Sequence, residues 1–145
     1  MFSASLALSM LSALALATSL APRQAVGSIT CDNGGAANIL TSDITTIIAS
    51  LNANGVVSGL NSGDPIFLGD GFEGFTTETG TQGTFQFTLD NQDLFDATHV
   101  SFSTVAQALA SYQGQCCGTF AMCIGGSTQV QGDTGLKVDL KMEAV

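Results

Sequence analysis

Three of the chain's four cysteines lie in the stretch Gln115-Cys-Cys-Gly-Thr-Phe-Ala-Met-Cys-Ile-Gly-Gly-Ser-Thr-Gln-Val-Gln-Gly132, which joins the clearest helical pattern to the last strand region. A disulfide holds its two Cα atoms about 4.4–6.8 Å apart with a dihedral angle of about ±90°. A bond between the neighbours Cys116 and Cys117 would strain the peptide between them. Two pairings remain, Cys31–Cys116 with Cys117–Cys123, or Cys31–Cys117 with Cys116–Cys123.

Either pairing fastens the distant Cys31 to the end of a helix. Closing so long a loop removes on the order of 4 kcal/mol of conformational freedom from the unfolded chain, and the short inner loop contributes less. Zinc or thiol redox chemistry is the alternative use of four cysteines. The chain has only one histidine, His99, and no second cysteine pair at zinc-finger spacing, so we interpret the cysteines as structural.

The N-terminus indicates the compartment in which these bonds form. From Ser5 to Ala17 the chain is rich in Leu, Ala and Met, and the run ends in the small-residue pattern that signal peptidases accept. It is shorter than the roughly 20 residues that span a bilayer. We therefore expect a signal peptide at residues 1–17 and a further proteolytic trimming of the N-terminus at Arg23. Residues 24–145 would then form a single secreted, extracellular, disulfide-bonded domain without a membrane span.

The net negative charge of the chain makes polyanionic partners unfavourable. The formal net charge is −9, and once the leader and Arg23 are removed only Lys137 and Lys141 oppose 12 acidic residues. Such a surface repels phosphate backbones, so no nucleic-acid partner is expected. Attraction to anionic lipid is equally unfavourable.

Hydrophobic periodicity predicts the elements. Ile44, Ile47, Ile48 and Leu51 recur at helical spacing and predict a helix over 41–55, and a second helix is predicted from Ser101 or Ser103 to Gly114. Predicted strands cover 25–31, 84–89, 128–131 and 136–143, with one more among the loops of 56–83, where 66–68 and 72–75 are apolar.

The last strand has one apolar and one charged face, which is typical of a sheet covered by helices on one side. We therefore expect an α+β fold, a two-layer sandwich of about four antiparallel strands with two helices on one face, in a split βαβ arrangement.

Several short motifs occur along this order of elements. They are Ile29-Thr30-Cys31, Gly34-Gly35, Ser42-Asp43-Ile44-Thr45, the Ala-rich helix 105–116 that ends in Cys116, Gly125-Gly126, and the closing strand 136–142. Together they resemble small secreted fungal proteins related to the smut-virus killer toxin α-subunit, many of which are candidate effectors. Such proteins usually carry more cysteines, including some in the middle of the chain, where this sequence has none between Cys31 and Cys116. The resemblance implies an effector or toxin-like protein that acts outside the cell on a host or microbial component.

Phe72 and Phe75 are the candidate partner-binding residues. They lie in a Gly-rich loop, where exposed apolar side chains are unfavourable unless they pack or bind a partner. Packing against the sheet is the simpler interpretation, and an exposed binding patch is the alternative.

Several acidic residues and the lone histidine are candidate catalytic or metal-binding groups. The stretch 64–73 lacks the alternating acids of a calcium-binding loop, and we interpret it as a solvated acidic loop. Asp90, Asp93 and Asp96 could supply a general acid and base, but such pairs are common in acidic proteins. His99 has no nucleophile motif beside it. We expect no catalytic residue, metal or cofactor. A small secreted hydrolase and a structural cell-wall protein are the alternatives to a binding protein.

Overall fold

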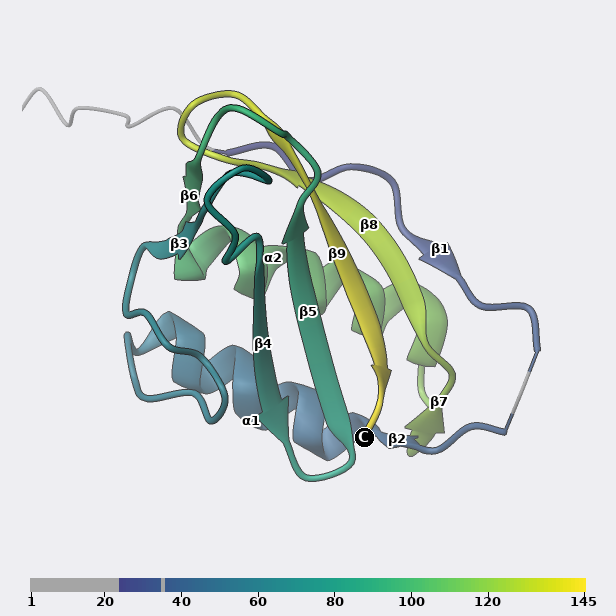
Figure 1. Ribbon diagram of the computed structural model, residues 1–145. Helices are drawn as coiled ribbons and strands as arrows, with labels where there is room; N and C mark the ends of the chain where they lie inside the picture. Colours follow the sequence, from purple (N-terminus) through teal and green to yellow (C-terminus); the bar gives the residue numbers. More distant parts are fainter. Residues whose placement is uncertain (1–23, 35) are drawn as a thin grey trace, which may run out of the picture.

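A five-stranded antiparallel sheet and two helices form the two layers of the structure, a computed structural model that describes residues 24–34 and 36–145 (Figure 1). The strands follow the order β1 (Thr30–Cys31), β8 (Gly126–Gln131), β9 (Lys137–Ala144), β5 (Phe85–Asn91) and β4 (Thr77–Gln82). Helices α1 (Thr41–Asn52) and α2 (Phe102–Tyr112) cover one face of this sheet. The expected signal peptide and the trimming point at residue 23 lie outside the described residues.

Two short ribbons complete the fold. β2 (Ile39–Leu40) pairs with β7 (Met122–Cys123), and β3 (Ile66–Leu68) pairs with β6 (Thr98–Val100), both antiparallel. Neither α1 nor α2 is long and apolar enough to cross a membrane, a finding that covers the described residues only.

The predicted α+β sandwich with two helices on one face is confirmed, with five strands in the sheet instead of about four. The strands β5 and β8 are both antiparallel to β9, which lies between them. The unit β5–α2–β8 is therefore a split βαβ arrangement. The strand predicted over 25–31 is shorter than expected, because only Thr30–Cys31 forms a strand and Val26 adds an isolated bridge to Val130.

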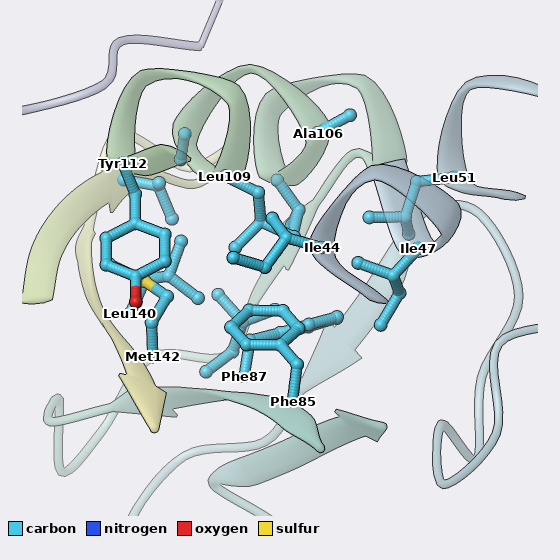
Figure 2. Close-up of a cluster of buried hydrophobic side chains, with 14 of the residues drawn as sticks. Ile44, Ile47, Leu51, Phe85, Phe87, Ala106, Leu109, Tyr112, Leu140 and Met142 are labelled. Atoms are coloured by element: carbon cyan, nitrogen blue, oxygen red, sulfur yellow. The ribbon is translucent and has the colours of Figure 1, made fainter. Parts of the chain in front are cut away.

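The core lies between the sheet and the helices. Side chains of β5 and β9 alternate between buried and solvent-facing positions, as their sequence pattern predicts. Figure 2 shows Phe85 and Phe87 pointing from the sheet toward the residues of the two helices. The ring of Phe85 stacks on Tyr112 with their centroids 6.3 Å apart. Each such fully buried side chain contributes about 1.5–3 kcal/mol.

The cysteine cluster adopts the first of the two pairings left open by the sequence. Cys31 bonds Cys116 with Cα atoms 5.5 Å apart, and Cys117 bonds Cys123 at 4.8 Å. A π-helical turn over Gln113–Cys117 ends α2 and presents its two neighbouring cysteines to different elements. Cys116 reaches β1 at the sheet edge, while the buried Cys117 reaches β7.

Tyr112 closes the core beside this cluster. Its hydroxyl donates to the backbone carbonyl of Ile124. Burial raises the pKa of Tyr112 to about 12, with a further contribution from the negative charge of Asp32. The hydroxyl therefore remains a hydrogen-bond donor throughout the neutral range.

Candidate binding surface

Two loops meet at the end of the sheet where β4 begins and β5 ends (Figure 1). One loop, residues 69–76, joins β3 to β4, and the other, residues 92–97, joins β5 to β6. The backbone N–H of Gly71 donates to the carbonyl of Asp93 at 2.9 Å, which links the loops directly. Residues far apart in sequence thus form one surface.

Four large apolar side chains cover this surface and make little contact with the core. Phe72 is 87% exposed, Phe75 86%, Leu94 61% and Phe95 78%. We call these four residues the paired-loop patch. The interpretation that Phe72 and Phe75 pack against the sheet is wrong, because both side chains are almost fully exposed and neither belongs to the buried core. Leu94 and Phe95 are not among the predicted binding residues, although two adjacent apolar residues between Asp93 and Asp96 are a signal in the sequence.

Both loops contain the same kind of turn, which directs a phenylalanine side chain toward solvent. In the first, Oδ1 of Asp70 accepts hydrogen bonds from the backbone N–H groups of Phe72 at 3.0 Å and Glu73 at 2.7 Å. Oδ1 of Asp93 accepts from the corresponding residues of the second loop, at 2.9 and 3.0 Å. An aspartate that bonds to the backbone two and three residues ahead stabilises such a turn. The shared sequence is Asp-x-Phe followed by an acid.

Asn91, at the end of β5, holds both loops in place. Its Nδ2 donates to the carbonyl of Gly69 at 3.0 Å and to that of Asp96 at 2.9 Å, and its Oδ1 accepts from the N–H of Asp93 at 3.1 Å. The residue is 2% exposed. Because a buried amide is costly unless its donors and acceptor are satisfied, this network fixes the loops relative to the sheet.

The backbone at Phe75 has an unfavourable conformation. Its φ is +63°, and the preceding Gly74 has φ +84°. A bulky residue in the left-handed region costs roughly 1–2 kcal/mol. The exposed ring of Phe75 gains no burial in return. Backbone strain of this kind clusters at binding and other functional sites.

Replacing Phe75 with glycine should therefore raise the free energy of unfolding by about 0.5–1 kcal/mol, because the relief of strain exceeds the entropy that glycine adds to the unfolded state. Phe72→Gly is the matched control. Phe72 is equally exposed but lies outside the left-handed region, so its replacement should lower stability slightly. Urea unfolding measures both, and equal shifts in the two variants would contradict strain at Phe75.

The surroundings of the patch are acidic. Asp70, Glu73, Asp93 and Asp96 lie in the two loops, and neither loop contains a lysine, arginine or histidine. Lys141 lies outside the two loops, on the face of the sheet that the helices do not cover, and forms an ion pair with Glu143 at 2.6 Å. None of the four loop carboxylates has a salt-bridge partner among the described residues.

The other candidate groups have structural partners. Asp64, in the acidic stretch 64–73, accepts a hydrogen bond from the first backbone N–H of α2 at 2.7 Å. Oδ2 of Asp90 accepts from the side chain of Gln92 at 2.6 Å, whereas Asp93 and Asp96 belong to the paired loops. In residues 24–34 and 36–145, no three His, Cys, Asp or Glu side chains gather as metal ligands would.

His99 lies beside Asp133 and Phe67. Its Nδ1 is 3.2 Å from Oδ2 of Asp133, and its ring centroid is 5.3 Å from that of Phe67. The backbone N–H of His99 donates to Asp133 and is the main cause of the lowered pKa of that carboxyl. Asp133 thus connects the β8–β9 turn to β6, which is a structural role.

Comparison with known proteins adds no family to this picture. No protein-family model matches the chain, and no curated protein is significantly similar to it. The relationship to killer toxins stays a hypothesis that depends on the short motifs quoted above.

Proposed function

We propose that this protein is a secreted, non-enzymatic effector or killer-toxin-like factor that binds a host or competitor component outside the cell. The observation that carries the proposal is the paired-loop patch, in which four large apolar side chains are 61–87% exposed on two linked loops. Large apolar side chains exposed together on linked loops, instead of scattered singly, are a mark of interaction sites. Aromatic residues on a rigid scaffold are also typical of the anchors that dominate binding energy.

Two further observations support the proposal. The two disulfides are consistent with an extracellular protein, since such bonds form and persist in oxidising compartments. The loops themselves are held by Asn91 and by the two aspartate turns, so the apolar side chains are presented in a fixed arrangement. A surface fixed before binding loses less conformational entropy when a partner docks.

A dose series of the oxidised protein on plant leaf tissue and on yeast and fungal cultures tests the proposal. We expect cell death or growth arrest that disappears when the protein is reduced and alkylated. The variant F72S/F75S should weaken the response by at least about tenfold, because truncating anchor residues typically costs 1–2 kcal/mol or more. F120S is the control, since Phe120 is 74% exposed and comes just before β7 in the chain, and Figure 1 shows β7 at the other end of the sheet.

The outcomes separate the proposal from its alternatives. F72S/F75S must be secreted and folded like the parent protein, because an unfolded variant would lose the response for a reason unrelated to the patch. Equal potency of F72S/F75S and the parent would contradict binding through the patch. A hydrolase should instead lose activity when His99 or a carboxylate is replaced in a folded protein. A structural wall protein should remain in the cell-wall fraction and cause no response.

A further inference from the structure

The carboxylates beside the paired-loop patch indicate the chemistry of its partner. We propose that the patch docks a basic, apolar segment of a partner protein, in which lysine or arginine side chains flank large apolar residues. This inference rests on the proposed function, because it assigns a partner class to the same surface.

Each exposed phenylalanine of the two turns has an acid on either side. Asp70 and Glu73 flank Phe72, and the corresponding acids flank Phe95. The turn hydrogen bonds use only Oδ1 of the leading aspartate in each loop, which leaves its charge in place. Apolar anchors and negative charges therefore alternate over the two loops. A complementary surface has apolar side chains alternating with positive ones.

The same charges act against the other classes of partner. Anionic lipid and nucleic acid are repelled by four carboxylates that no lysine or arginine of the loops offsets. Insertion of Phe72 or Phe95 into a neutral bilayer would carry the adjacent acids Glu73 and Asp96 toward the hydrocarbon region, which is unfavourable for charged groups. A protein segment can bury the rings and pair the carboxylates at the same time. The charge pattern thus selects a basic protein partner.

The test uses two synthetic amphipathic peptides of about 18 residues, one built from lysine and leucine and the other from glutamate and leucine. Their binding to the whole oxidised protein is measured by fluorescence anisotropy in about 20 mM and about 300 mM NaCl. We expect the lysine peptide to bind at least about tenfold more tightly than the glutamate peptide, and about tenfold more weakly at the higher salt concentration.

Variants assign the binding to this surface. E73Q/D96N removes two charges without altering either aspartate turn, and should reduce affinity for the lysine peptide about fivefold and flatten its salt dependence. F72S/F95S should abolish binding. D32N/D139N is the matched control, because it removes two charges from residues that lie outside the paired loops, and it should bind like the parent protein.

Several results would overturn the inference: equal binding of both peptides, binding that ignores salt, no binding of the lysine peptide, or association with neutral phosphatidylcholine vesicles through the same residues. The partner class can be wrong while the proposed function is right. If F72S/F75S abolishes the tissue response while the parent protein ignores the lysine peptide, the proposed function stands and the partner class is wrong. If the lysine peptide binds the patch but the tissue response is independent of Phe72 and Phe75, the proposed function fails instead.

Discussion

Replacing Cys31 and Cys116 with alanine should lower the free energy of unfolding by about 4 kcal/mol, which is the largest stability effect expected from the loss of a single disulfide in this protein. The bond closes a loop between residues 85 positions apart and ties β1 to the end of α2. Without it, the unfolded chain regains the freedom that the closed loop removes. Since domains of this size are stable by about 5–15 kcal/mol in total, the variant should be partly unfolded at moderate temperature.

Urea unfolding without reductant, followed by circular dichroism, measures this loss. C31A/C116A retains the short Cys117–Cys123 loop and should show no alkylatable thiol. C31A/C117A removes one partner from each bond, so it should be less stable still and expose two thiols. A loss below about 1 kcal/mol for C31A/C116A would contradict a major stabilising role of the long loop. Two free thiols in that variant would contradict the pairing seen in the structure.

The parts of the fold that could be predicted are those in which one periodicity runs through a whole element. Residues 136–143 alternate between apolar and charged, and the strand β9 occupies almost the same range. The helix predicted over 41–55 is α1, which ends three residues earlier at Asn52. In both cases a single buried face determines the element, so the sequence contains the information locally.

Strand β4 could not be predicted in this way. Its sequence, Thr-Glu-Thr-Gly-Thr-Gln, has no apolar alternation, and its only buried residue is Gly80. A Cβ atom at that position would lie 2.4 Å from the ring of Phe87, so glycine is required by the neighbouring strand β5 and not by a local preference. The strand exists because its backbone pairs with β5 along its full length.

The candidate surface was only half predicted, for a related reason. Phe72 and Phe75 could be identified as candidates because they are apolar residues in a polar loop. Whether they pack against the sheet or project into solvent depends on which residues of other elements form the core. The second loop joins the first through Asn91, whose role depends on contacts to residues up to 22 positions away. No short-range sequence pattern predicts such a buried amide.

Replacing Asn91 with alanine should therefore have the largest effect on binding of any change outside the apolar patch itself. The variant loses three hydrogen bonds and leaves the buried carbonyl of Gly69 without this donor, which should lower the free energy of unfolding by about 2–3 kcal/mol. Because Phe72 and Phe95 themselves are unchanged, any loss of binding reports the positions of the loops. We expect at least about tenfold weaker binding of the lysine peptide and of the natural partner.

Limited proteolysis separates this positioning role from global unfolding. Chymotrypsin should cut N91A faster than the parent protein at Phe72, Phe75 and Phe95, while the circular dichroism of the variant remains that of a folded protein, since loops that lose their anchor open locally. N61A is the matched control, because Asn61 is exposed and its side chain bonds only to Glu78 at 3.4 Å, so its loss should cost less than about 0.5 kcal/mol and leave the loops protected. If N91A keeps both its resistance to chymotrypsin and its affinity for the peptide, the loops are held by their own aspartate turns, and Asn91 stabilises the fold without organising the binding surface.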